Sequence, residues 1–197
     1  MHQRTEEVLA YMETERAGLE RALVGIPTGS RATRPAPERW SAAEVLEHLS
    51  LVEAGIAKRI GAAIESARAA GLGPETSTEP ILPTFDVARV RVRTPTLVAG
   101  EAIQPHSGVE FAAAAAALKE QREKLRATLV AADGLALGEV IIPHAAFGEL
   151  NVYQWVVFAS AHEGRHSGQI EEIAEHFNHA GGQDPRLASS LEPDVEA

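Results

Sequence analysis

The clearest structural signal in this sequence is the start of a helix at Ser41. Ser41 and Glu44 have the spacing of a capping box, in which each side chain satisfies a backbone N–H of the first helical turn. Trp40 and Val45 occupy the two positions of a hydrophobic staple around it. Apolar residues then recur at spacings of three and four, at Val45, Leu49, Val52, Ile56, Ile60 and Ile64. This periodicity predicts a long amphipathic helix that ends near Gly71.

Three further segments also have helical signals. An apolar stripe predicts a first helix over residues 5–24. Ser107 and Glu110 have the spacing of another capping box, which predicts a third helix extending to about residue 132. The fourth helix is expected to begin after Asn151, with Gln154 at the reciprocal capping position, and to end before residue 181.

A long connection separates the second and third predicted helices. Residues 71–108 are rich in Pro and Gly, and such a segment either covers a pocket or simply returns the chain. Within it, residues 90–93 alternate Val and Arg and are interpreted as a short edge strand. Arg89, Arg91 and Arg93 would then share one face, as a local anion site or a solvated surface.

These elements predict an all-α protein, a four-helix bundle with a long crossover connection between helices two and three. No convincing central sheet is visible in the sequence. We expect the bundle to span residues 1–182 and a polar tail to follow at 183–197.

Composition excludes several functional classes. The chain has 18 Lys and Arg against 28 Asp and Glu, a formal net charge of −10 that disfavours nucleic acid as a partner. It has no cysteine, which excludes disulfides, thiolate metal ligands and cysteine nucleophiles. Neither a bilayer-spanning apolar run nor a signal peptide is visible, so we expect a cytoplasmic protein without a membrane partner.

The most informative motif is a histidine pair on the fourth predicted helix. His162 and His166 are four residues apart, so their side chains emerge on one face. That face also carries the apolar stripe, which predicts that both rings point into the bundle. Buried imidazoles need partners, and a divalent metal, zinc or nickel first, would supply one to both.

A third candidate ligand lies on the second predicted helix. His48 belongs to the same core-facing stripe as Val45 and Val52, so packing of the two helices could bring it onto the pair. Three histidines leave one position of a tetrahedral ion open, which is the geometry of catalytic sites.

Other residues near these histidines have weaker assignments. Gln169 is expected on the same helix face, where it would hydrogen-bond a ligand or metal-bound water, or take part in a simple interhelical hydrogen bond. Glu44 and Glu53 flank His48 and are expected to be partly solvated, with a possible role in orienting a ring. His106 and His144 lie in predicted loops as possible fourth ligands. The remaining histidines, His2, His176 and His179, are expected on the surface.

The fourth predicted helix also contains a protease-like pattern. His162-Glu163-Gly164-Arg165-His166 satisfies H-E-x-x-H, with Glu163 as the general base of a zinc peptidase. The further histidine of one peptidase class is missing, and Glu192, the available downstream carboxylate, lies in the predicted tail. We therefore favour a surface position for Glu163.

Three segments together resemble the DinB-like superfamily, and most closely its second subgroup. They are WSAAEVLEHL (40–49), HAAFGELN (144–151) and HEGRHSGQI (162–170). The resemblance implies a four-helix bundle, often a homodimer, that binds a divalent metal through His48, His162 and His166. Ala145 stands where the superfamily often has proline.

The resemblance also implies a class of chemistry. Characterised members include metal-dependent thiol S-transferases, mycothiol-dependent isomerases and hydrolases, in which a metal activates water or a low-molecular-weight thiol. We expect a small-molecule substrate, with a thiol supplied as a co-substrate because the chain has no cysteine. Trp40, Asn151 and Trp155 are candidates to shape the substrate pocket. The alternative from another class is a bundle that binds metal without catalysis.

Overall fold

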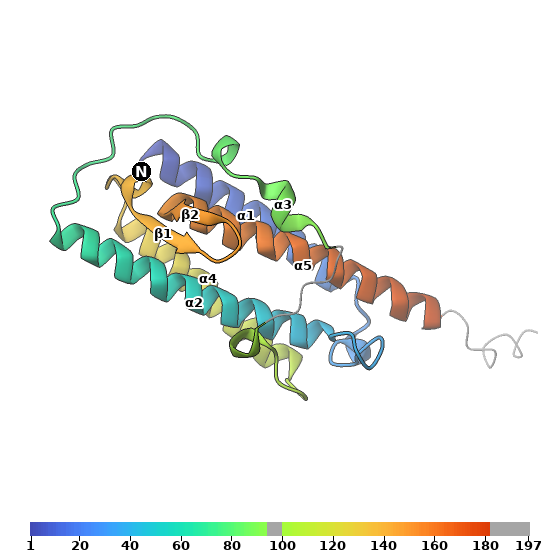
Figure 1. Ribbon diagram of the computed structural model, residues 1–197. Helices are drawn as coiled ribbons and strands as arrows, with labels where there is room; N and C mark the ends of the chain where they lie inside the picture. The colour runs from blue at the N-terminus through green and yellow to red at the C-terminus, as the bar shows by residue number, and fades with distance from the viewer. Residues whose placement is uncertain (94–99, 182–197) are drawn as a thin grey trace, which may run out of the picture.

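Four long helices make up most of the molecule (Figure 1). The computed structural model describes residues 1–93 and 100–181. The long helices are α1 (Gln3–Val24), α2 (Ala42–Ala69), α4 (Phe111–Ala131) and α5 (Val152–Gly181). The predicted tail at 183–197 lies outside the described residues.

The long helices pack in two pairs that share one interior. α1 runs along α5, α2 runs along α4, and α2 also contacts α5 (Figure 1). The buried apolar side chains form two clusters between these helices, with Met12, Ile60, Leu125 and Val156 in one and Leu19, Leu49, Leu118 and Ile170 in the other. The all-α prediction is confirmed at this level, because the described strands form only one small hairpin.

The predicted starts of α2 and α5 are confirmed in atomic detail. The Ser41 hydroxyl accepts a hydrogen bond from the Glu44 N–H at 3.2 Å, and the Glu44 carboxylate accepts one from the Ser41 N–H at 2.8 Å. Asn151 and Gln154 exchange the same two bonds at 2.9 and 3.0 Å. These caps set the first turn of each helix, and therefore the direction in which the later histidines project.

The connection from α2 to α4 contains short helical pieces in place of the predicted strand. They are η2 (Leu82–Thr84), α3 (Val87–Arg91) and η3 (Glu101–Ile103), and α3 lies beside α5 (Figure 1). The Asp86 carboxylate accepts from the Arg89 N–H at 3.0 Å and so caps α3. The strand prediction at 90–93 was wrong because this cap favours a helical turn over extension.

The three arginines of this segment consequently separate and do not share an anion site. Arg89 donates to the Ala146 carbonyl, Arg91 pairs with Glu15, and Arg93 pairs with Glu172.

The start of α4 differs from the prediction. Gly108 has a φ of +76°, which is incompatible with a right-handed helix, so α4 cannot begin after Ser107. The helix starts at Phe111, and Glu110 occupies the cap position without a side-chain capping bond. The predicted Ser107–Glu110 capping box was therefore wrong.

A small antiparallel hairpin between α4 and α5 was not predicted. It consists of β1 (Ile141–His144) and β2 (Gly148–Asn151), with Ile142 opposite Leu150. Gly148, with φ +75°, closes its turn. Two further short pieces complete the described elements, η1 (Thr28–Ser30) and η4 (Leu137–Glu139). Among the described helices, none combines the length and apolarity that a bilayer span needs.

Candidate metal centre

Three histidines from two helices converge between α2 and α5. Their candidate ligand nitrogens all lie within 4.8 Å of one another. The centroid of the His48 ring is 5.3 Å from that of His162 and 5.0 Å from that of His166, and the last two are 4.6 Å apart. The structure thus brings together the three residues that helical spacing predicts, on facing helices.

Two of these rings are held by oxygen atoms outside the cluster. His48 Nδ1 lies 2.7 Å from the carbonyl oxygen of Ile103 in η3, and His166 Nδ1 lies 2.8 Å from Oε1 of Gln169. Because these oxygens only accept, each Nδ1 carries the proton and donates it. The Nε2 atom of each ring therefore keeps a lone pair, as a metal ligand requires.

Burial keeps the three rings neutral at physiological pH. His48 and His166 are 4% and 6% exposed, while His162 retains part of its accessible surface. Burial lowers the pKa of His48, and burial together with the charge of His48 lowers the pKa of His166 to about 3. Burial and the two neighbouring rings lower the pKa of His162 well below its usual value. Neutral imidazole is the form that binds metals.

The spacing of the nitrogens fits a divalent cation. His162 Nε2 and His166 Nε2 are 3.3 Å apart, and a tetrahedral ion with Zn–N bonds of 2.0–2.1 Å would separate two ligands by about 3.3–3.4 Å. Without a proton or cation between them, the lone pairs of neutral rings at this distance repel each other. The donor set and its geometry therefore fit a metal.

The comparisons with known proteins identify the family. The model of the DinB superfamily matches residues 11–170, which include all three histidines. The chain belongs to the DinB superfamily. A relative in Bacillus subtilis (strain 168), the uncharacterized protein YuaE, is 28% identical over 159 residues, which cover 80% of this chain and 91% of that protein. No solved structure matches the chain.

Aromatic side chains flank the histidines of this DinB protein on both helices. The ring of Trp40, just before α2, lies 5.0 Å from that of His48, and the ring of Phe158 stacks on that of His162 at 5.9 Å. Trp40, a predicted pocket residue, is thus beside the cluster. Phe158 was not named from the sequence, although its place four residues before His162 puts it on the same face.

The other two predicted pocket residues, Asn151 and Trp155, form hydrogen bonds that hold the start of α5. The Asn151 side chain caps α5, and the Trp155 indole N–H donates to the Ile142 carbonyl at 3.0 Å, which ties the helix to the hairpin. The described ring contacts of Trp155 are with Phe158 and His144, at 5.9 and 4.9 Å, and none is with the three candidate ligands. A role for Asn151 and Trp155 in substrate binding stays a prediction.

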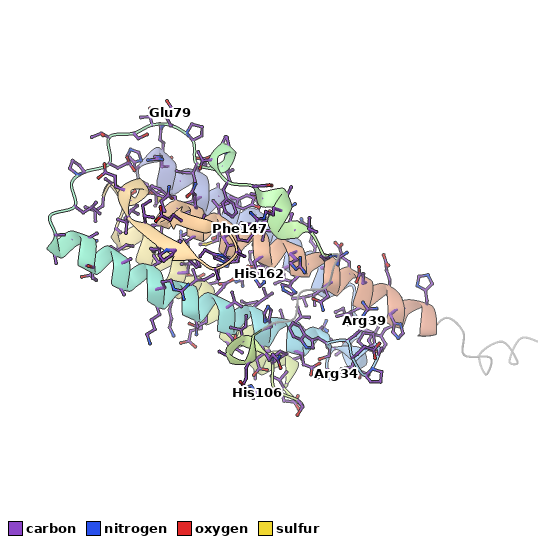
Figure 2. The ribbon with its side chains drawn as sticks, viewed as in Figure 1. Arg34, Arg39, Glu79, His106, Phe147 and His162 are labelled. Carbon is purple, nitrogen blue, oxygen red and sulfur yellow. The ribbon has the colours of Figure 1, made fainter. Side chains whose placement is uncertain are left out.

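The two loop histidines lie outside the cluster. His106 is exposed and pairs with Glu47 at 3.0 Å, and Figure 2 shows it on the far side of α2 from His162. His144 Nδ1 accepts the N–H groups of Ala146 and Phe147, and its ring lies 4.5 Å from that of Phe158. His144 therefore neighbours the site through an aromatic contact and does not join the three candidate ligands.

The glutamate of the H-E-x-x-H pattern has a different environment from the predicted one. Glu163 is 0% exposed and pairs with Arg16 of α1 at 2.8 Å and with Arg122 of α4. The predicted surface position was wrong, because two arginines from other helices compensate the buried charge. These ion pairs also occupy the carboxylate, so it is not poised to act as the base of a peptidase.

Glu53 and Glu44 are likewise buried, and their predicted partial solvation was wrong. Glu53 is 1% exposed and pairs with Arg122 at 3.1 Å. Glu44 is 3% exposed and binds Arg34 in addition to its capping bond. Neither carboxylate has a described hydrogen bond to His48, whose Nδ1 contacts Ile103.

The carboxylates and guanidinium groups of Arg16, Glu53, Arg122 and Glu163 form one buried charge cluster, which joins all four long helices. Glu163 adjoins His162 in sequence, so α5 carries a member of the charge cluster next to a candidate metal ligand. The two members of each ion pair lie far apart in sequence, so no local sequence pattern could predict this cluster.

Proposed function

We propose that this protein is a metal-dependent enzyme of the DinB type that acts on a small molecule. His48, His162 and His166 would hold a divalent cation, with zinc or nickel as the first candidates. When bound, the cation would supply Lewis-acid chemistry that lowers the pKa of a water molecule or a low-molecular-weight thiol, for hydrolysis or S-transfer. Membership of the superfamily and the convergence of three imidazoles support this proposal.

One observation carries the proposal. Two of the three rings donate their Nδ1 protons to fixed oxygens, so the Nε2 lone pairs of His48 and His166 remain for a metal, and the described neighbour of His166 Nε2 is the Nε2 atom of His162 at 3.3 Å. A site built only to pack histidines would give these nitrogens protein donors. With three protein ligands, one coordination position is left for substrate, in contrast to the four ligands of structural sites.

The residues of the chain contribute position and environment. Ile103 and Gln169 fix two ring orientations, and the rings of Trp40 and Phe158 lie against those of His48 and His162. The long helices and their crossover connection support the further proposal that residues 1–182 form the four-helix bundle of the superfamily.

Elemental analysis of the purified protein tests the site. We expect about one zinc or nickel ion per chain in the wild type and none in the variant His48→Ala/His162→Ala. The variant His176→Ala/His179→Ala removes two exposed histidines from α5 and is the matched control that should keep its metal. Metal that persists in the first variant would contradict the proposed site.

Turnover then separates the enzyme from the alternative, a bundle that binds metal without catalysis. The metal-loaded and chelator-treated proteins should be screened with ester, amide and epoxide substrates, with and without an added thiol. Turnover that requires the metal supports the enzyme. A loaded protein that turns over none of these classes would favour the non-catalytic alternative.

The proposed setting is a homodimer in the cytoplasm, without a nucleic-acid or membrane partner. The net charge of −10 supports the exclusion of nucleic acid. Light scattering on the eluting protein would test the dimer, and a monomer mass would contradict it.

A further inference from the structure

We infer that Arg165 binds the carboxylate of an organic anion at the three-histidine site, and this inference rests on the proposed function. Arg165 lies on α5 three residues after His162 and four before Gln169, so its side chain emerges on the same side of the helix as these two. The inference names the class of substrate as carboxylate-bearing small molecules.

The Arg165 guanidinium has no carboxylate partner among residues 1–93 and 100–181. Its one described bond runs from Nη1 to the Val90 carbonyl at 3.5 Å, the upper limit for a hydrogen bond. The side chain is half-buried, and its remaining N–H groups stay accessible to solvent. Five donors with a single long bond leave most of the binding capacity of this group for a ligand.

Neighbouring arginines of the same region are paired, which distinguishes Arg165 from them. Arg91 pairs with buried Glu15, and Arg93 lies over Gly168 and pairs with Glu172 at 2.7 Å. Burial and the charge of Arg93 lower the pKa of Arg165, although an arginine still remains protonated. A partly desolvated cation of this kind gains more from an anion than a fully exposed one does.

The charge of Arg165 reaches all three candidate metal ligands. Its charge contributes to the lowered pKa of His48, of His162 and of His166. A divalent cation on these rings would add further positive charge beside it. Because the whole chain carries −10, this positive region is local and favours an anion at the site itself.

The surroundings indicate the shape of that anion. The planar fork of arginine matches a carboxylate through two parallel hydrogen bonds. The rings of Trp40 and Phe158 flank the histidines and offer apolar contact to the body of a small organic molecule. A ligand with a carboxylate at one end and a metal-binding atom at the other satisfies both groups.

Calorimetric titration of the zinc-loaded protein with two matched probes tests the inference. The probes are β-mercaptopropionate and its neutral amide, β-mercaptopropionamide, which share a thiol and differ in the carboxylate. We expect the wild type to bind the acid with a dissociation constant about 10- to 100-fold lower than that of the amide, which is the effect of a charge-assisted hydrogen bond. The preference should nearly disappear in Arg165→Gln and become intermediate in Arg165→Lys, which keeps the charge but not the fork.

Controls make the outcomes distinct. Arg21→Gln removes an exposed charge near the end of α1 and should keep the full preference. Zinc content and circular dichroism of Arg165→Gln verify that its site and fold are intact. A preference that survives in Arg165→Gln would overturn the inference and leave the proposed function standing, because the metal alone would then select the acid.

The remaining outcomes separate the two proposals. If the amide fails to bind while the acid binds through Arg165, the inference stands, and zinc content and turnover decide the proposed function separately. Failure of both probes to bind the wild type would overturn the inference and the thiol-binding form of the proposed function, whereas the turnover assay decides the hydrolytic form.

Discussion

Replacing Arg122 with Met should destabilise the protein strongly, because Arg122 compensates two buried carboxylates. The Arg122 side chain is 4% exposed, and the side chains of its partners Glu53 and Glu163 are buried as well. Met keeps much of the apolar volume but leaves Glu163 with Arg16 alone and Glu53 without a described ion pair. Breaking a buried pair from one side costs about 3–5 kcal/mol, roughly a fifth or more of the stability of an ordinary domain.

The matched control is Arg126→Met, one turn further along the same helix. Arg126 and Glu13 are 45% and 60% exposed and lie 3.7 Å apart, so their pair is worth less than about 1 kcal/mol. Urea denaturation followed by circular dichroism gives both free energies of unfolding. Both variants should be measured with chelator present, because a bound metal would add its own stabilisation.

The pH dependence provides a second test of the same prediction. Burial raises the pKa of Glu53, and the charges of Arg122 and Arg16 oppose that rise. Without Arg122 the pKa should rise further, and a group with a raised folded pKa loses stability as pH increases through that value. The deficit of Arg122→Met should therefore be smaller at about pH 5 than at about pH 8. Equal deficits for the two variants, or a deficit that does not change with pH, would refute the reasoning.

Two further predictions concern α5. A Cβ at Gly164 would clash with the Glu15 carboxylate, so Gly164→Ala should lower the free energy of unfolding by about 1–3 kcal/mol. The control is Gly55→Ala in α2. A Cβ there meets no atom within 4 Å, so this variant should raise the free energy of unfolding by about 0.5–1 kcal/mol. Thermal melts compare the two, and stabilisation by both would contradict the packing described. Gln169→Leu removes the acceptor for His166 Nδ1 and should weaken zinc binding about 10- to 100-fold without altering the fold. Competition with a chelating dye measures this, and unchanged affinity would exclude an orienting role for the amide.

The parts of the fold that local chemistry determines were predictable from the sequence. A helix cap involves residues three apart, so Ser41 with Glu44 and Asn151 with Gln154 could be identified without tertiary information. The candidate metal ligands were predictable for a related reason. Helical periodicity puts His48 and the His162 pair on core-facing stripes, and two such stripes face each other when the helices pack.

The features that were not predicted depend on contacts distant in sequence or on a weak local signal. Buried Glu163 relies on Arg16 and Arg122 from other helices, and a glutamate in isolation is expected at the surface. The alternating residues of α3 fit a strand as well as a helix, and only the cap at Asp86 distinguishes the two. At the start of α4, the left-handed backbone of Gly108 prevents the helix from beginning after Ser107, which had been predicted to cap it.

The hydrogen bond from His48 to the carbonyl of Ile103 has a consequence for how the protein tolerates mutation. Every amino acid supplies a backbone carbonyl, so the identity of the side chain at this point of the connection is free to vary as long as the path of the chain is kept. Single substitutions across η3 should therefore be nearly silent for the site, whereas deleting or inserting one residue would withdraw the acceptor and release the imidazole. The site depends here on the length of a loop, a requirement that comparisons of residue identity do not reveal.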